Sequence, residues 1–176
     1  HLNLVDLIND CVDYARPLAK EKSLKLKTTF SGKAIVLNAN ESALWALIRN
    51  LLDNAIKYST DGGEVQILCH AYSQEIHLCV LDTGLGIPEL EKERVLERFH
   101  RGLGHKEQGS GLGLSIVQRV VEMHGGRLKL ANRRDGQPGL RVEVVFPTQL
   151  KDTDTDEILP HSSTSEMNNS PLAPSH

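Results

Sequence analysis

The chain has 176 residues, of which 39% are hydrophobic and 24% charged, with a formal net charge of −3. This composition is typical of one globular domain, the absence of any apolar run near ~20 residues argues against a membrane span, and the negative balance argues against nucleic-acid binding. Three widely spaced cysteines, Cys11, Cys69 and Cys79, fit neither a disulfide framework nor a zinc site and favour reduced thiols in a reducing compartment.

The N-terminal part of the chain predicts a helix followed by two short strands. Residues 4–22 place apolar side chains at close to a helical period, and Pro17 inside this run predicts a kink or a restart. Residues 24–30 alternate between apolar and polar side chains, as strands do, and residues 34–37 form a second short run, with a serine-glycine pair as the turn between them.

Residues 41–58 predict a long helix that starts after the N-cap Asn40 and carries a first candidate site. Asn50, Asn54 and Lys57 fall on one stripe that borders the apolar face, although asparagine is a mediocre helix former. An amide oxygen is a neutral ligand for Mg²⁺, which suits a metal that arrives with a triphosphate, and Lys57 could meet the phosphate charge. A pair of surface asparagines without a ligand is the alternative.

The next segment predicts an antiparallel pair of strands that ends in a glycine-containing loop. Residues 64–82 alternate in two runs joined by a short turn, and the loop DTGLGIP spans residues 82–88. Asp82 at the strand end can accept a hydrogen bond from an exocyclic amine, which adenine has and guanine lacks at that position. Gly84 and Gly86 let the backbone approach a flat ligand closely, and a plain Asp-Gly turn is the alternative.

A second glycine-rich run leads into the last predicted helix. Residues 89–98 predict a short helix, residues 100–111 a polar loop with four glycines, and residues 112–124 a helix. The run GSGLGLSIV, residues 109–117, therefore stands at a helix N-terminus, where backbone N–H groups and the helix dipole can bind phosphate. Its spacing matches neither a P-loop nor a dinucleotide-binding fingerprint, and a glycine hinge without a ligand is the alternative.

The chain ends in a predicted hairpin and a polar tail. Two alternating segments joined by DGQPG predict the hairpin, and residues 148–176 carry five acidic residues against one lysine, a net charge of −4. We therefore expect one domain over residues 1–147 and a disordered acidic, Ser/Pro-rich tail over residues 148–176. The expected fold class is an α/β (α+β) two-layer sandwich, in which a mixed, mostly antiparallel sheet packs on helices on one face.

Taken together, four motifs carry a family resemblance that none carries alone. NLLDNAIKYS, DTGLGIP, ERFHRG and GSGLGLSIV follow one another in this order, and they resemble the N, G1, F and G2 boxes of the ATP-binding catalytic domain of bacterial sensor histidine kinases. The wider superfamily includes gyrase, the Hsp90 chaperones and the MutL repair proteins. The resemblance covers roughly residues 3–147 and implies the Bergerat-type ATP-binding fold of that superfamily.

The resemblance also implies the roles of individual residues. It implies that Asn54 and Asn50 hold Mg²⁺, and that Lys57 reaches the phosphates of ATP. It implies that Arg101 contacts the γ-phosphate, so the implied catalytic residues are Asn50, Lys57 and Arg101. The implied nucleotide contacts are Asn50, Asn54, Lys57, Tyr58, Asp82, Gly84, Gly86, Ile87, Phe99, Arg101, Gly109, Ser110, Gly111, Leu112, Gly113 and Leu114.

Position 50 separates phosphoryl transfer from hydrolysis. ATP-hydrolysing members of the superfamily usually carry a glutamate base there, whereas the Asn50 amide cannot act as a general base. None of the eight histidines lies in the His-Glu/Asp-x-x-x-Pro motif of the family's phosphoacceptor hairpin. The resemblance therefore implies an enzyme that donates the γ-phosphoryl group of ATP to a histidine on a separate dimerisation domain, for relay to a response-regulator aspartate.

This reading carries further expectations about the parent protein. We expect a cytoplasmic, monomeric fragment that begins just after the acceptor domain, in a parent anchored in the bacterial inner membrane. A non-catalytic nucleotide-binding interaction module is the main alternative, and an ATPase of the gyrase or chaperone type is a third reading that Asn50 argues against.

Overall fold

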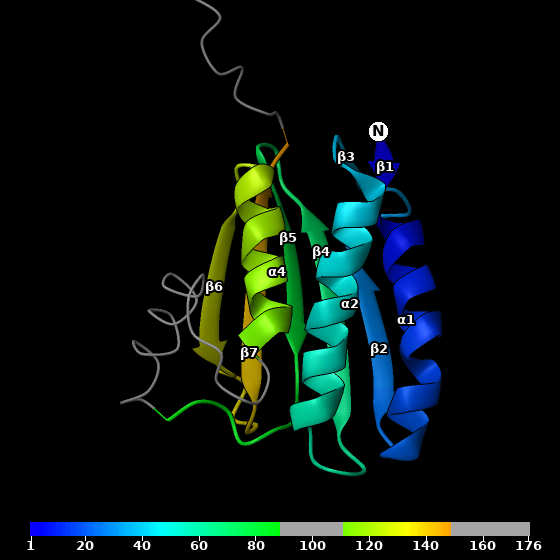
Figure 1. Ribbon diagram of the computed structural model, residues 1–176, viewed down its shortest axis with the longest axis vertical. Coiled ribbons are helices and arrows are strands. Elements are labelled where there is room, and N and C mark those ends of the chain that lie inside the picture. Colours follow the sequence, from blue (N-terminus) through cyan, green and yellow to red (C-terminus); the bar gives the residue numbers. More distant parts are fainter. Residues whose placement is uncertain (89–110, 149–176) are drawn as a thin grey trace, which may run out of the picture.

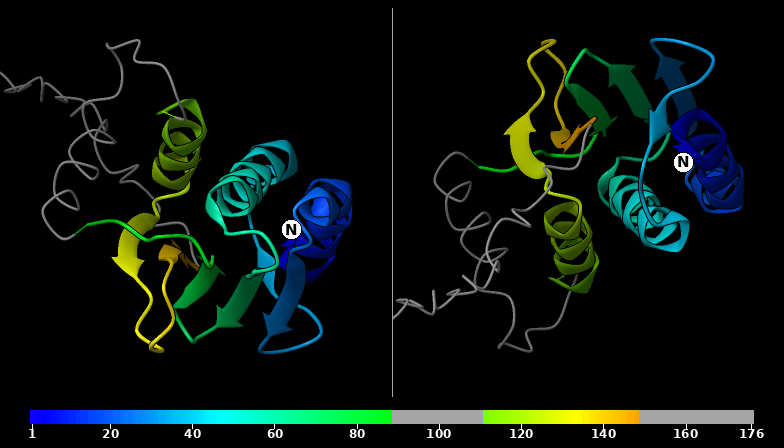
Figure 2. Two further views of the ribbon diagram at one scale, coloured as in Figure 1. Left: turned by 90° about the horizontal axis from the view of Figure 1, so that it is seen from below. Right: turned by 90° about the horizontal axis from the view of Figure 1, so that it is seen from above.

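The computed structural model describes residues 1–88 and 111–148, which form two layers (Figures 1 and 2). One layer is a five-stranded sheet and the other consists of helices that all lie on one face of it. The helices are α1 (Leu4–Glu21), α2 (Glu41–Tyr58) and α4 (Gly111–Met123). The strands of the sheet are β2 (Lys25–Phe30), β4 (Glu64–Ala71), β5 (Glu75–Leu81), β6 (Arg127–Asn132) and β7 (Leu140–Pro147).

The strand order is β2-β4-β5-β7-β6, and the sheet is mixed but mostly antiparallel. β2 pairs with β4 in parallel, whereas the pairs β4–β5, β5–β7 and β6–β7 are antiparallel. The two predicted hairpins, β4–β5 and β6–β7, and the predicted fold class are therefore confirmed. None of the described helices is long and apolar enough to cross a membrane.

The helix α2 forms as the sequence predicts and supplies the middle of the core. The side chain of its N-cap, Asn40, accepts a hydrogen bond from the backbone nitrogen of Ala43 at 2.9 Å. The apolar face of α2 is buried against the sheet and the two neighbouring helices, and its buried side chains are Leu44, Leu47, Ile48, Leu51, Leu52, Ala55 and Ile56. The three cysteines are free and buried.

Two details of the N-terminal part differ from the sequence prediction. The segment 34–37 forms β3 (Val36–Leu37), which pairs with β1 (Leu2–Asn3) and not with β2. β2 instead pairs in parallel with β4, and a parallel pair needs a long crossover, which the segment containing β3 and α2 provides. The helix α1 also continues through Pro17 without a restart, on a face of the helix where Asp13 and Pro17 are both exposed.

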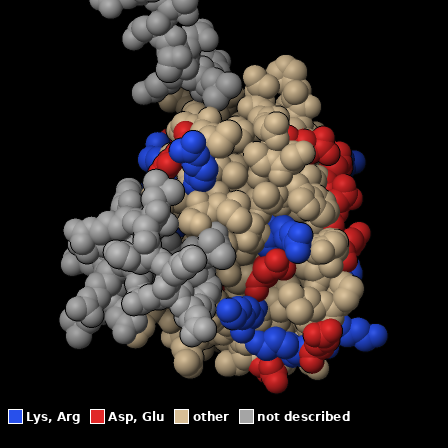
Figure 3. Space-filling view, in the orientation of Figure 1, with Lys and Arg blue, Asp and Glu red and all other residues tan. Residues whose placement is uncertain are grey.

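The three motifs within the described residues meet at one end of the molecule, the lower end in Figure 1. There α2 ends, the loop after β5 begins, α4 starts and the β6–β7 hairpin turns. On the helix face, Figure 3 shows Asp and Glu side chains mainly along the right edge, a mixture of both signs at the lower end, and a largely uncharged upper middle. The visible charges of this face therefore do not build one large field of a single sign.

Candidate functional site

The two asparagines of α2 lie against the first turn of α4. A Cβ atom added to Gly113 would lie 3.0 Å from Oδ1 of Asn50 and 3.3 Å from Nδ2 of Asn54. Glycine at this position therefore allows the start of α4 to approach both amides closely. The fold brings together an amide pair and a helix N-terminus that are about 60 residues apart in sequence.

The two amides differ in their hydrogen bonds. Asn50 donates from Nδ2 to the backbone oxygen of Ala46 at 2.7 Å. With the amide held in this way, its Oδ1 faces Gly113. Asn54 is different, because its Nδ2 is buried and has no hydrogen-bond partner in the described part of the chain. A buried polar group without a partner costs roughly 1–3 kcal/mol, so this atom indicates a ligand group that completes the site.

The donor set at this place fits a magnesium–phosphate ligand. A phosphate oxygen can accept from Nδ2 of Asn54, and the same amide turned over presents Oδ1 to a cation. Across residues 1–88 and 111–148, no group of three or more His, Cys, Asp or Glu side chains is arranged to hold a metal ion. A divalent ion held here would therefore take neutral amide oxygens from the protein and its anionic ligands from bound phosphates, which is a usual arrangement for Mg²⁺.

The side chains at the end of α2 are open to solvent. Tyr58 is 49% exposed, and the ammonium group of Lys57 lies 5.3 Å from the centroid of its ring. Both side chains are thus exposed at the end of α2, and their predicted contacts with phosphate stay a prediction. The structure itself does not place Lys57 against Asn50 or Asn54.

Asp82, directly after β5, is the most deeply buried carboxylate of the described residues. It is 5% exposed, and its Oδ1 accepts from the backbone nitrogens of Gly84 and Leu140, both at 2.9 Å. Burial raises the pKa of Asp82 above its ordinary value, while the two backbone hydrogen bonds and the charge of Arg133 act in the opposite direction. Both hydrogen bonds go to Oδ1, and among residues 1–88 and 111–148 the structure gives no donor to the second carboxylate oxygen, which can therefore accept a hydrogen bond from a ligand.

The loop that follows Asp82 packs on the end of α2. A Cβ atom on Gly84 would lie 2.5 Å from the backbone oxygen of Tyr58, so only glycine allows this approach. The backbone nitrogen of Thr83 donates to Oγ of Ser59 at 3.3 Å, and Thr60 donates from its backbone nitrogen to the oxygen of Thr83 at 3.4 Å. These contacts join the end of α2, which carries Asn50 and Asn54, to the loop that follows Asp82.

Lys22 is a contributor that the sequence analysis missed. Its ammonium group reaches the end of α2 and donates to the backbone oxygens of Ile56, Lys57 and Ser59 at 3.0, 3.0 and 2.6 Å. A cation at this place satisfies carbonyl groups that a helix end leaves free and favours the negative end of the helix dipole. No local sequence signal reveals this contact, because Lys22 lies 34 to 37 residues before its partners.

The other predicted site residues have different outcomes. Phe99, Arg101, Gly109 and Ser110 lie outside the described residues. Gly111 and Leu112 start α4, and the side chain of Leu114 packs against the hydrophobic core. Gly86 has a φ of +71°, which requires glycine, and both backbone polar groups of Ile87 are hydrogen-bonded to Asn132.

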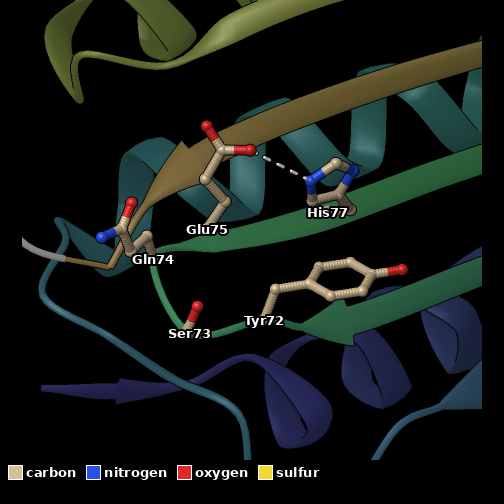
Figure 4. Close-up of a pocket in the computed structure, with 5 residues that line it drawn as sticks. All are labelled: Tyr72, Ser73, Gln74, Glu75 and His77. Carbon is tan, nitrogen blue, oxygen red and sulfur yellow. Dashed lines mark hydrogen bonds and ion pairs between the residues drawn. The ribbon is translucent and has the colours of Figure 1, made fainter.

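A hollow at the opposite end of β5 does not belong to this site. It has a volume of about 470 Å³ and is lined by Tyr72, Ser73, Gln74, Glu75 and His77 (Figure 4). Glu75 lies 3.3 Å from the imidazole of His77 and also receives a hydrogen bond from Arg127 at 2.6 Å. Its charged groups are therefore already paired with one another, unlike the amide of Asn54.

Comparisons with known proteins agree with this geometry. Residues 39–150 match the family model of the histidine kinase-, DNA gyrase B-, and HSP90-like ATPases. The sensory kinase SasA of Rippkaea orientalis is 37% identical over 124 residues, which are 69% of this chain and 32% of SasA. The sensor protein QseC of Escherichia coli K12 is 35% identical over 143 residues, 81% of this chain and 30% of QseC.

Solved structures share the fold. The mycobacterial sensor histidine kinase MprB superposes with a TM-score of 0.69 at 29% identity, covering 85% of this chain and 97% of that one. The catalytic domain of the histidine kinase ThkA gives a TM-score of 0.72 at 25% identity, covering 84% and 93%. The chain spans about a third of the length of the curated relatives that it matches. It belongs to the histidine kinase-, DNA gyrase B- and HSP90-like ATPase family and is a catalytic domain of the sensor histidine kinase type.

Proposed function

We propose that this domain binds ATP together with Mg²⁺ and donates the γ-phosphoryl group to a histidine on a separate helical hairpin of its parent protein. The observation that carries the proposal is the buried, unpartnered Nδ2 of Asn54, which lies beside the start of α4. This atom lies near the end of α2, on which the loop of the buried carboxylate Asp82 packs, and the two groups together support a polar ligand there.

In this proposal, different residues bind the base, the metal ion and the phosphates of ATP. The free carboxylate oxygen of Asp82 accepts a hydrogen bond from the 6-amino group of adenine. Asn50 and Asn54 hold the metal ion and a phosphate, and the backbone N–H groups at the start of α4 receive the phosphate chain. Lys57 and Arg101 add positive charge at the phosphates, and Arg101 does so at the γ-phosphate. Mg²⁺, when bound, neutralises the charge that develops on the phosphate oxygens.

Transfer is favoured over hydrolysis because the α2 side chains at the site, within the described part of the chain, offer water no base. Asn50 cannot take a proton, and the nearby carboxylate of Asp53 is engaged by Arg49 at 3.5 Å on a neighbouring stripe of the helix. In the transfer step, the bond from the γ-phosphorus to the bridging oxygen breaks, ADP leaves, and a bond to an imidazole nitrogen forms. Phosphoryl transfer depends mainly on positioning and charge stabilisation, which these residues supply.

The parent protein then passes the phosphoryl group to an aspartate of a response-regulator receiver domain. One solved structure shows ThkA, which shares this fold, in complex with the response regulator protein TrrA. For this chain, the receiver domain, a monomeric state of the isolated fragment, and a cytoplasmic position beneath a membrane-anchored sensor are parts of the proposal.

Calorimetric titration of ATP, with and without Mg²⁺, tests the proposal directly. We expect Asn54→Ala to lose most of the Mg²⁺ dependence and Asp82→Ala to lose the preference for adenine over guanine. Asn38→Ala is the matched control, because Asn38 is exposed and lies outside the site. Addition of a purified acceptor hairpin should then yield phosphohistidine.

Three outcomes would point elsewhere. Absence of nucleotide binding by the unaltered chain would refute the proposal. Binding without transfer to the acceptor hairpin would favour a nucleotide-binding interaction module. Steady release of inorganic phosphate by the domain alone would favour an ATPase of the gyrase type.

A further inference from the structure

The loop that carries Asp82 is held on its far side by the turn end of the β6–β7 hairpin. Asp82 donates from its backbone nitrogen to the oxygen of Leu140 at 3.0 Å, and Leu140 donates from its nitrogen to Oδ1 of Asp82 at 2.9 Å. Arg133, whose side chain is only 6% exposed, donates from Nη1 to the backbone oxygen of Asp82 at 3.1 Å. The hairpin therefore fixes the start of the loop from behind.

Gly139 makes this close approach possible. Its φ is +134°, a backbone conformation that favours glycine, and a Cβ atom there would overlap the carbonyl oxygen of Asp82. Its carbonyl oxygen accepts from the backbone nitrogen of Arg133 at 3.0 Å, which closes the hairpin at this point. The backbone of the hairpin thus lies directly against the backbone of the loop.

The far end of the loop is held by one side chain, Asn132, the last residue of β6. Its Oδ1 accepts from the backbone nitrogen of Ile87, and its Nδ2 donates to the backbone oxygen of the same residue, each at 2.9 Å. Within residues 1–88 and 111–148, these are the two hydrogen bonds of Ile87. A Cβ atom on Gly86 would lie 2.8 Å from Oδ1 of Asn132, so the loop glycine and the amide fit one another.

This pairing is the side-chain equivalent of a strand–strand contact. A primary amide has a donor and an acceptor at the spacing of a peptide group, so asparagine can satisfy both backbone groups of Ile87 at once. An aspartate of the same shape keeps an acceptor for the N–H group but places its second oxygen against the carbonyl oxygen, where two acceptors repel. The Asn132→Asp exchange therefore separates the hydrogen bonds from the packing.

We propose that Asn132 is a positioning residue for nucleotide recognition, because its two hydrogen bonds to Ile87 hold the 82–88 loop in the conformation that presents Asp82 to adenine. This inference rests on the proposed function of the site. The loop is fixed at Asp82 by Leu140 and at Ile87 by Asn132, and Gly84 and Gly86 lie between these points. Loss of the Asn132–Ile87 hydrogen bonds leaves the glycine-containing part of the loop free to move. The loop then adopts several conformations, and fewer of them orient Asp82 for adenine.

The experiment uses three variants of the whole chain: Asn132→Ala, Asn132→Asp and the control Lys129→Ala. Lys129 is exposed on the same strand, where it pairs with Glu143 of β7. Amide hydrogen exchange of Ile87, followed by NMR without nucleotide, reads the hydrogen bonds directly. Calorimetry gives the affinities for ATP and for ITP, whose base carries an oxygen in place of the 6-amino group, and thermal unfolding gives the melting temperature.

We expect Asn132→Ala to accelerate the exchange of Ile87 roughly fivefold or more, and both Asn132 variants to weaken ATP binding roughly three- to tenfold. The ratio of ATP to ITP affinity should fall in both variants, whereas Lys129→Ala should change neither quantity. A purely structural role would lower the melting temperature and leave this ratio unchanged, which would overturn the inference. If the unaltered chain binds no ATP, the proposed function fails and the inference falls with it. If it binds ATP and the Asn132 variants keep the wild-type ratio, the inference alone is wrong.

Discussion

Replacement of Asp82 by asparagine should separate stability from recognition. The amide that Asp82→Asn introduces has the shape of the carboxylate, and its oxygen can still accept from the backbone nitrogens of Gly84 and Leu140. The amide nitrogen, however, replaces the second carboxylate oxygen with an N–H donor. This donor would face the 6-amino group of adenine, which is also a donor, so no hydrogen bond can form between them. Loss of a hydrogen bond to a charged group costs roughly 1.5–3 kcal/mol, which corresponds to a ~10- to 150-fold weaker affinity for ATP.

The same exchange should change which base is preferred. An amide N–H group at this position can donate to the 6-oxo group of ITP, so the ATP preference should shrink or invert. The Mg²⁺ dependence, which we propose rests on Asn54, should be kept. Calorimetric titration of both nucleotides into both proteins measures this. An unchanged ATP affinity in a folded Asp82→Asn variant would refute the assignment of Asp82 to the base.

Stability should respond in the opposite direction. Because burial raises the pKa of folded Asp82, the protonated form stabilises the fold below the unfolded pKa, and that contribution is lost as the pH rises through the folded pKa. The ionised carboxylate is therefore the less favourable form at neutral pH, and a neutral amide removes this cost. Thermal unfolding at pH 8 should show Asp82→Asn to be at least as stable as the unaltered chain, with a difference that shrinks as the pH falls into the acidic range.

Three further predictions concern the parts that support the site. Lys22→Met should lower the free energy of unfolding by roughly 1–3 kcal/mol in denaturant titrations, because three carbonyl oxygens at the end of α2 lose their partner, and an unchanged midpoint would contradict this role. Gly113→Ala should weaken Mg²⁺–ATP binding several-fold in calorimetry without unfolding the domain, since its Cβ would press on Asn50 at 3.0 Å, and equal affinity would contradict the close approach of α4. The three cysteine thiols, whose pKa values burial raises to about 12, 12 and 11, should resist alkylation at pH 8 until the protein is unfolded, as mass spectrometry of the native protein would show.

The sequence predicts those parts of the site that lie within one element. The helical period places Asn50 and Asn54 on one stripe of α2, and the loop glycines follow the strand that ends before Asp82. That these parts meet follows only from the order of the motifs and their family resemblance. The spacing of residues along one helix or one loop contains no information about which distant element packs against it.

The contacts that the sequence does not reveal are those between distant segments. Asn132 reaches Ile87 across 45 positions, and Lys22 reaches Ile56 across 34, and neither lies in a recognisable motif. An asparagine at a strand end and a lysine after a helix are ordinary features of solvated surfaces. The β6–β7 hairpin lies against the 82–88 loop only because the sheet places β7 beside β5 in this register.

This architecture connects nucleotide binding to folding of the whole domain. β5 lies between β4 and β7, so Asp82 at its end is held on one side by the end of α2 and on the other by the last hairpin of the fold. The site is therefore complete only when segments from both ends of the domain have assembled, and a ligand that binds it binds the folded state alone. A ligand at a hundred times its dissociation constant then stabilises that state by about 2.7 kcal/mol. A shift of the melting temperature by ATP should accordingly become smaller in the Asp82→Asn variant, in step with its weaker calorimetric affinity, because both quantities report binding to the folded state.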